Sequence, residues 1–457
     1  MDLNTLSMKR ISLLFGLALM MTNALGQTNP AITSFLLNTT GVKGRHYMSG
    51  SSVVLEDTLT ANVLSIQYSN SFAYVKANGI PSYVTGPFNN NPQPTAKAQN
   101  RLFKIPLNPT PKTGTKTNVG PGRNGIFING VPFFNAGDGR SYMNQNKWHN
   151  NAYIFEKNGF DCNRGHPETQ GTYHHHMNPS AFHVASVVSS TICNPYLADG
   201  LYVPDSTKHG PLIGFAFDGY PVYGAYGYSN PMDTTSPIKR MKSSYQLRNI
   251  TDRTTLPDGS AATGPAINAN IQNPGTVIVA VLGAYKEDFE YVQGSGDLDE
   301  SNVRFCKTPE YPNGTYCYFA TIDEQGLPVY PYLTGPTYFG VVETTNTQPV
   351  GPTITEPVVT YTPSVTGVGS FEKTSPSVLI FPNPSNDVLV VQSMVAWNLD
   401  RKVELVSSDG KIVRTDILRQ GSTMCYFDTQ TLHAGIYMVR IVSPSGISQI
   451  TKVVIGE

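Results

Sequence analysis

Histidine is concentrated in one short stretch of this 457-residue chain. Five of the nine histidines fall between positions 166 and 183, namely His166, His174, His175, His176 and His183. Successive side chains of a strand point to opposite faces, so His174 and His176 would share one face and His175 would take the other. Neutral imidazole is a good ligand for Zn, Cu, Fe and Ni. The spacing therefore predicts a transition-metal site, for Cu or Zn, built on His174 and His176.

Further ligands are expected close by. His166 lies eight residues before His174, and a turn over 167–171 would bring its imidazole back beside the pair. Asp218 is either another ligand, the acceptor that orients an imidazole, or the cap of the turn at Gly219. His149 and His183 are reserve ligands. Two alternatives remain open, namely hydrogen-bonded structural histidines and metal-free acid/base catalysis, and no residue is assigned a catalytic role.

A glycine-rich loop over 294–300 carries three carboxylates, Asp297, Asp299 and Glu300. Oxygen ligands at such spacing suit Ca²⁺, although the loop lacks the full pattern of an EF-hand. Turn capping and catalytic carboxylates are the alternatives. Calcium is therefore a second expected cofactor.

The first residues have the order of a secretory signal peptide. Lys9 and Arg10 precede an apolar run over 11–21, and small residues come just before Gln27. The run is shorter than the roughly 20 residues that span a bilayer, so we expect cleavage after Gly26 and a secreted protein without a transmembrane segment.

Export permits disulfides. The chain has five cysteines, and sequence alone does not decide how they pair. Proximity favours one bridge between Cys162 and Cys193 and another between Cys306 and Cys317. Cys425 is left without an obvious partner.

The composition favours an all-β, loop-rich protein. Gly and Pro number 41 and 34, and Tyr and Phe number 25 and 20, which is typical of turns and strands. The formal net charge is zero, which argues against a nucleic-acid partner. The pattern predicts a signal peptide over 1–26, an N-terminal β-rich extension over 27–125, a β-rich core over 126–340, a Thr/Pro-rich linker over 341–374 and a small C-terminal β-sandwich over 375–457.

The C-terminal region resembles a known export module. Phe381-Pro382-Asn383-Pro384, the turn Ser408-Asp409-Gly410-Lys411, the segment 432–437 and the final strand 452–455 are similar, in this order, to the type A C-terminal sorting domain of the type IX secretion system. The resemblance implies a Gram-negative source, with the secretion machinery as partner and a tag that is usually removed. Cys425 would leave with the tag.

The core resembles the YHYH domain family. Tyr173-His174-His175-His176 corresponds to the motif Tyr-His-Tyr-His, with His175 in place of the second Tyr, and similar stretches occur at 148–149, 162–167, 214–224, 296–300 and 308–316. Ser301 stands where relatives usually have Cys, and with Cys306 and Cys317 nearby this implies a relocated disulfide. The resemblance covers roughly 125–340 and implies an architecture, not a reaction.

The favoured function is thus a secreted YHYH-domain protein that binds a transition metal through its histidine cluster, located extracellularly or at the cell surface. One alternative is a non-catalytic carbohydrate- or surface-binding protein that uses Tyr220, Tyr223, Tyr226 and Tyr228. The other is a structural envelope protein whose histidines hold the core.

Overall fold

The computed structural model describes residues 28–39, 41–48, 54–88, 95–179, 204–273, 276–363, 378–393, 400–408, 410–420, 423–443 and 446–456. The predicted signal peptide and its cleavage position lie outside these residues. The chain divides between Thr362 and Pro363 into two compact units. The prediction of a β-rich protein with a separate C-terminal region of strands is confirmed.

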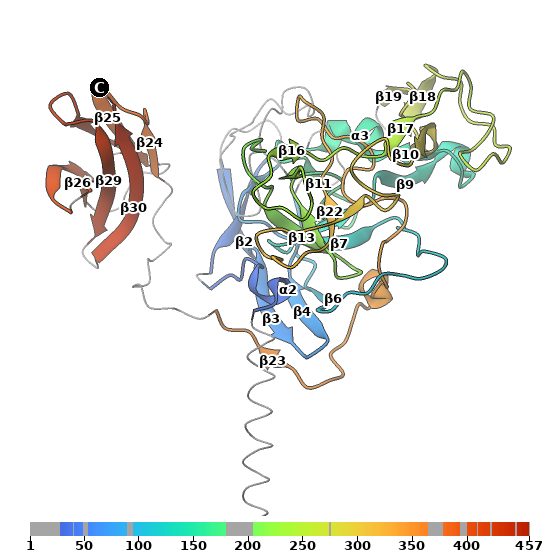
Figure 1. The fold of residues 1–457 in the computed structure, drawn as a ribbon, viewed down its shortest axis with the longest axis horizontal. Helices are drawn as coiled ribbons and strands as arrows, with labels where there is room; N and C mark the ends of the chain where they lie inside the picture. Colours follow the sequence, from blue (N-terminus) through green and yellow to red (C-terminus); the bar gives the residue numbers. More distant parts are fainter. Residues whose placement is uncertain are drawn as a thin grey trace, which may run out of the picture. The chain divides into compact units, whose positions relative to one another are not determined.

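An eight-stranded sheet forms the centre of the first unit (Figure 1). Its strands, in spatial order, are β11 (Gly165–Pro167), β12 (Tyr173–His175), β8 (Pro132–Phe134), β7 (Arg123–Phe127), β13 (Leu212–Ala216), β14 (Pro221–Tyr223), β22 (Thr315–Phe319) and β21 (Val303–Cys306). All five residues of β13 are buried, as expected for a central strand covered on both faces. The histidine-bearing strands β11 and β12 lie at one edge.

Two smaller sheets come from the N-terminal region. One is ordered β23 (Val359–Thr360), β3 (Val63–Tyr68), β4 (Phe72–Ala77) and β6 (Arg101–Pro106), and the other β2 (Val54–Thr60), β1 (Lys43–Tyr47) and β5 (Val84–Thr85). Side chains of β3, β4 and β6 share one hydrophobic cluster with those of β7, β13 and β22. The N-terminal extension expected over 27–125 is therefore part of the same packed body as the core.

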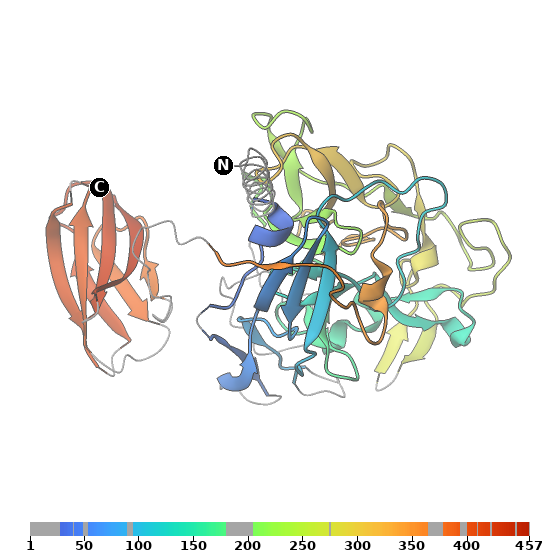
Figure 2. The same cartoon turned by 90° about the horizontal axis from the view of Figure 1, so that it is seen from below.

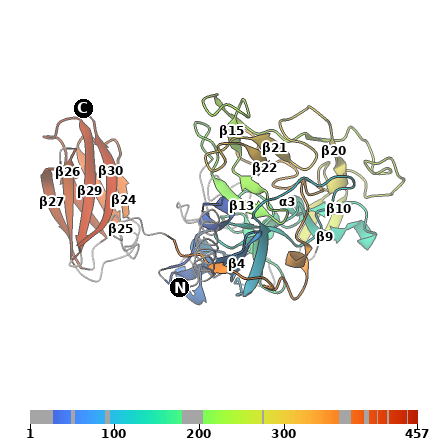
Figure 3. The ribbon, with the colours of Figure 1, turned by 60° about the horizontal axis from the view of Figure 1, so that its bottom comes forward.

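Two-stranded ribbons and short helical turns complete this unit. The ribbons are β9 (Gly137–Ser141) with β10 (His149–Asn151), β15 (Tyr226–Tyr228) with β16 (Ile238–Arg240), β17 (Tyr245–Leu247) with β20 (Phe289–Tyr291), and β18 (Asn270–Asn273) with β19 (Thr276–Val279). The helical turns are α2 (Pro30–Thr33), α3 (Ala152–Phe155), η1 (Tyr142–Asn144), η2 (Lys157–Gly159), η3 (Lys286–Asp288) and η4 (Thr344–Thr347). Figure 3 shows β9, β10 and β20 together at one end of the unit.

The segment expected to be a linker begins later than predicted. Val359 and Thr360 pair with β3, and the Asn346 side chain bonds to both backbone groups of Lys104. Tyr74 donates to the carboxylate of Glu356 at 2.6 Å. Residues 341–362 thus belong to the first unit, because backbone pairing and buried polar contacts compensate for their poor apolar content. The rest of the expected linker, 364–374, lies outside the described residues.

The second unit is a small β-sandwich. One sheet contains β24 (Val378–Phe381), β25 (Val388–Ser393) and β28 (Met424–Asp428), and the other contains β27 (Ile412–Leu418), β26 (Arg401–Ser407), β29 (Gly435–Ser443) and β30 (Gly446–Ile455) (Figure 2). Alternate residues such as Leu389, Val403 and Val439 point inward and form its core. Cys425 is a buried free thiol in this unit. Across the described part of the chain, no helix has the length and apolarity to cross a membrane.

Candidate metal centre

A tight hairpin positions the histidines. Strands β11 and β12 pair antiparallel, with His166 opposite His174 and Gly165 opposite His175. The turn between them is held by the Glu168 carboxylate, which accepts from the backbone N–H groups of Gln170 and Thr172. Gly171, at φ 88°, completes the turn in a backbone conformation that favours glycine. Cross-strand partners have adjacent side chains, so this register brings His166 beside His174.

The two faces of the hairpin have different surroundings. His175 points into the core, where its Nε2 lies 2.8 Å from the Tyr83 hydroxyl and its Nδ1 lies 3.1 Å from the Arg164 carbonyl oxygen. Gly165 lies opposite, and a Cβ there would overlap the Tyr173 hydroxyl. His175 is therefore a packed and hydrogen-bonded structural histidine.

On the other face, three imidazoles converge. One ring nitrogen from each of His166, His174 and His176 lies within 4.8 Å of the other two. The Nε2 atoms of His174 and His176 are 3.1 Å apart. All three residues are at most 5% exposed. It is the one group of three or more potential metal ligands so close together in the described part of the chain.

The hydrogen bonds fix the tautomers of two of these rings. His174 Nδ1 lies 3.0 Å from the Thr172 carbonyl oxygen, and His176 Nδ1 lies 2.6 Å from the Asn135 carbonyl oxygen. A carbonyl only accepts, so each Nδ1 carries the hydrogen and each neutral ring has its lone pair on Nε2. These two Nε2 atoms face each other. Two lone pairs that face each other at 3.1 Å would repel, so a shared proton or a cation must lie between the two Nε2 atoms.

Glu156 completes the cluster and was not predicted from the sequence. It is the C-cap residue of α3, and its Oε2 lies 3.0 Å from His176 Nε2 and 3.6 Å from His166 Nε2. Its side chain is 26% exposed, so it forms the solvent side of an otherwise buried group. The cluster thus has three nitrogen donors and one carboxylate oxygen.

Burial and charge set the protonation of these groups. Burial lowers the pKa of His166 to about 4, and it lowers the pKa of His174 well below the ordinary value, with the neighbouring imidazoles adding to both effects. Burial opposes the charge of His176 too, but Glu156 beside it raises the pKa of His176. His166 and His176 in turn hold the pKa of Glu156 below its ordinary value despite burial. Two of the three imidazoles are therefore kept neutral, which is the form that binds metal.

Asp218 does not join the cluster. Its carboxylate accepts from the Tyr318 hydroxyl at 2.6 Å and from the backbone N–H groups of Gly340 and Tyr220. The turn that carries Asp218 follows β13, which is separated from β12 by β8 and β7. Three strand spacings amount to about 14 Å. Asp218 therefore caps its turn and ties β13 to β22, and its expected role as a ligand is corrected.

The reserve ligands do not join it either. The His149 ring pairs with Glu287, and its Nε2 lies 3.1 Å from the Asn146 side-chain oxygen. His183 lies outside the described residues. Tyr220 and Tyr223, considered as a sugar-stacking surface, are buried packing residues.

The three loop carboxylates each have their own partner. Asp297 pairs with Lys239, Asp299 accepts from the backbone of Ser301 and Val303, and Glu300 pairs with Lys116 at 3.0 Å. The carboxylates do not form a group of three in the described part of the structure. Turn capping and ion pairing account for the positions of Asp297, Asp299 and Glu300, and calcium binding at this loop stays a prediction.

The structure leaves both predicted disulfides open. Cys306 and Cys317 are buried free thiols whose side chains interact with each other across β21 and β22. The bridge expected between them is not formed in this structure and stays a prediction for the secreted protein. Cys193 lies outside the described residues, so its pairing with Cys162 also stays a prediction.

Comparison with known proteins supports both resemblances. Residues 379–456 match the secretion system C-terminal sorting domain, so the protein is exported by the type IX machinery to the outside or surface of the cell. No curated protein matches the chain. Residues 102–330, half of the chain, match the family described as YHYH protein, and this span contains the whole hairpin together with Glu156. The chain therefore belongs to the YHYH protein family.

Proposed function

We propose that this secreted protein binds one transition-metal ion, Zn²⁺ or Cu²⁺, through His166, His174 and His176. The observation that carries the proposal is the convergence of three imidazoles in a buried site, with one ring nitrogen from each within 4.8 Å of the other two. His166 Nε2 and Glu156 Oε2 are buried there without a hydrogen bond, which costs free energy, and a metal ion would satisfy both of them together with the facing Nε2 atoms of His174 and His176.

The separations in the cluster suit such an ion. A tetrahedral site with bonds of about 2.0–2.1 Å to nitrogen has ligand atoms about 3.3–3.4 Å apart. The observed separations are 3.1 Å between His174 and His176, 3.0 Å between His176 and Glu156, and 3.6 Å between His166 and Glu156. These values lie on both sides of the ideal, so small side-chain shifts would complete the coordination.

The ligand set also suits the chemistry. Each Nδ1 that donates to a backbone carbonyl fixes the ring and directs Nε2 toward the centre, as is usual for metal-binding histidines. Three protein nitrogens leave a fourth position for Glu156 or for water. With water there, the ion would lower the pKa of that water, and Glu156 would be placed to accept its proton.

Calorimetric titration of the metal-free secreted protein with Zn²⁺ and with Cu²⁺ tests the proposal. We expect one ion per chain, and we expect His174→Ala combined with His176→Ala to abolish binding. His209→Gln is the matched control, because His209 packs against Tyr223 and Phe319, away from the cluster. If the double variant binds both ions as tightly as the wild type, the histidines are structural and the proposal is wrong.

A further inference from the structure

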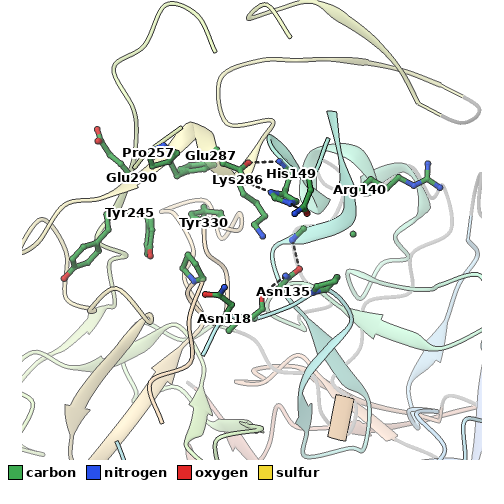
Figure 4. A pocket seen from close by; sticks show the side chains of 18 residues that line it. Asn118, Asn135, Arg140, His149, Tyr245, Pro257, Lys286, Glu287, Glu290 and Tyr330 are labelled. Carbon is green, nitrogen blue, oxygen red and sulfur yellow. Dashed lines mark hydrogen bonds and ion pairs between the residues drawn. The ribbon is translucent and has the colours of Figure 1, made fainter. Parts of the chain in front are cut away.

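A second site lies beside the histidine cluster. A pocket of about 630 Å³ opens between the β9–β10 ribbon, η3 and the β17–β20 ribbon (Figure 4). This volume is typical of pockets that bind small molecules. Asn135 connects the pocket with the histidine cluster, because it lines the pocket and its carbonyl oxygen accepts a hydrogen bond from His176 Nδ1. The pocket is therefore close to the proposed metal centre but formed by different side chains.

One wall of the pocket is aromatic. The rings of Phe289 and Tyr330 stack at 4.3 Å with an interplanar angle of 9°, and Tyr245 contacts both Tyr330 and Tyr291. All four side chains line the pocket. Such rings offer flat apolar faces with polar edges, which suit the C–H face of a sugar ring that carries hydroxyl groups around its rim.

Lys286 provides a positive charge at the centre of the pocket. It is the first residue of η3, and its side chain points into the pocket in Figure 4. Within the part of the chain that the structure describes, its ammonium group has no hydrogen bond and no ion pair. The adjacent carboxylate of Glu287 is already occupied by the ring and the backbone N–H of His149. Burial lowers the pKa of Lys286 although the nearby carboxylates of Glu287 and Asp138 act in the other direction, and a bound anion would add to their effect.

The charged side chains of the lining balance one another. Lys286 and Arg140 are cationic, whereas Glu287 and Glu290 are anionic, so the attraction for an anion is confined to the surroundings of Lys286, which suits a ligand with one carboxylate placed there. Asn118 and Glu290 also line the pocket and have no side-chain hydrogen bond among the described residues. Their amide and carboxylate groups are suited to pair with hydroxyls.

We propose that this pocket binds a sugar ring bearing one carboxylate, as in uronic-acid oligosaccharides, with the carboxylate on Lys286 and the ring on the aromatic wall. None of the three histidines lines the pocket, so the proposal does not require a bound metal ion.

Calorimetry on the secreted protein in EDTA tests this proposal without any contribution from the metal centre. The probes are oligosaccharides of galacturonate, of mannuronate and guluronate, and of glucuronate, each with its neutral counterpart, together with a sulfated oligosaccharide. We expect at least one uronate to bind at least tenfold more tightly than its neutral counterpart. Lys286→Met should remove this preference, since it keeps the length of the side chain and loses the charge.

Lys147→Met is the control, because Lys147 is exposed and its ammonium donates to the Ala261 carbonyl oxygen outside the pocket. Tyr291→Ala should weaken uronate and neutral sugar alike. The comparison of uronate with neutral sugar uses the wild type only, so it holds even if a variant misfolds. The proposal is overturned if no uronate binds, if the neutral counterparts bind as tightly, if a folded Lys286→Met variant keeps the preference, or if the sulfated sugar binds more tightly than every uronate.

Discussion

The histidines on the two faces of one short strand, β12, differ in their hydrogen bonding. On the core face, His175 has a complementary partner for each ring nitrogen, and Asp161 below it accepts four hydrogen bonds, from Tyr173 and from the backbone of Gly86, Asn163 and Gly165. On the other face, His166 Nε2 and Glu156 Oε2 are buried without a hydrogen bond, and the Nε2 atoms of His174 and His176 need a proton or a cation between them. These polar groups of the first face all have hydrogen-bond partners within the protein, whereas two groups of the second face have none.

This contrast in hydrogen bonding distinguishes His175 from the other three histidines. Each unsatisfied buried polar group costs about 1–3 kcal/mol, so folding favours polar groups that satisfy one another. The unpaired His166 Nε2 and Glu156 Oε2 therefore call for an explanation, which the proposed metal ion would give. Replacing residues on one face or the other should therefore change different properties of the protein.

The largest effect is expected on the core face. His175→Leu removes the partner of the Tyr83 hydroxyl and of the Arg164 carbonyl oxygen, so we expect it to lower the free energy of unfolding by about 4 kcal/mol, at 1–3 kcal/mol for each group. Urea unfolding in EDTA measures this change. If His175→Leu still folds, it should bind metal like the wild type. A loss of metal affinity with unchanged stability would show that the two faces of β12 do not have separate roles.

Asp161 should make the core face sensitive to pH. Burial raises the pKa of Asp161 to about 7, although its hydrogen bonds act in the other direction. The folded protein then holds this proton more tightly than the unfolded chain, so stability falls as the pH rises from about 4 to about 7. We expect the stability of the wild type relative to Asp161→Asn to fall by about 3 kcal/mol over this range. Urea unfolding of both proteins at several pH values gives the difference, and a constant difference would show that Asp161 is ionised throughout.

The local part of the histidine cluster was predictable from the sequence. Alternation along a strand placed His174 and His176 on one face, and the Pro- and Gly-bounded turn brought His166 back to them. Both are properties of neighbouring residues. The family resemblance located the region but did not distinguish His175 from the other histidines, and that distinction depends on Tyr83, which is far away in the sequence.

The non-local part was not predictable. Asp218 was a reasonable ligand only if β13 lay beside β12, but β7 and β8, which come earlier in the chain, lie between them. Glu156 has no motif around it, and it reaches the cluster because α3 packs on the β9–β10 ribbon. Likewise, the composition of 341–374 indicated a linker, whereas backbone pairing of Val359 and Thr360 with β3 holds the segment up to Thr362 on the first unit. Strand order and long-range packing decide these positions, and a single sequence does not specify them.

Replacing Glu156 should lower metal affinity less than replacing the histidines. Glu156→Gln keeps the shape of the side chain but removes the charge that lies 3.0 Å from His176 Nε2. Partners of this kind usually change metal affinity by about 10–100-fold, so we expect weaker but measurable binding of Zn²⁺ in calorimetric titration. Complete loss would make Glu156 as essential as the histidines, and unchanged affinity would place it outside the centre.

The smallest expected effect is a gain in stability, and it tests the contrast between the two faces of β12 most directly. His166→Leu is the same substitution as His175→Leu, but it removes a buried imidazole whose Nε2 has no hydrogen bond and replaces it with an apolar side chain against Phe160. Without metal, we expect the free energy of unfolding to rise by about 1 kcal/mol, since the desolvated nitrogen is gone. With Zn²⁺ at about 100 times its Kd, the wild type should gain about 2.7 kcal/mol and the variant little, so the order of stability should reverse. Urea unfolding of both proteins in EDTA and in Zn²⁺ measures this reversal. If His166→Leu destabilises the metal-free protein as His175→Leu does, then His166 is satisfied without a metal and the two faces do not differ.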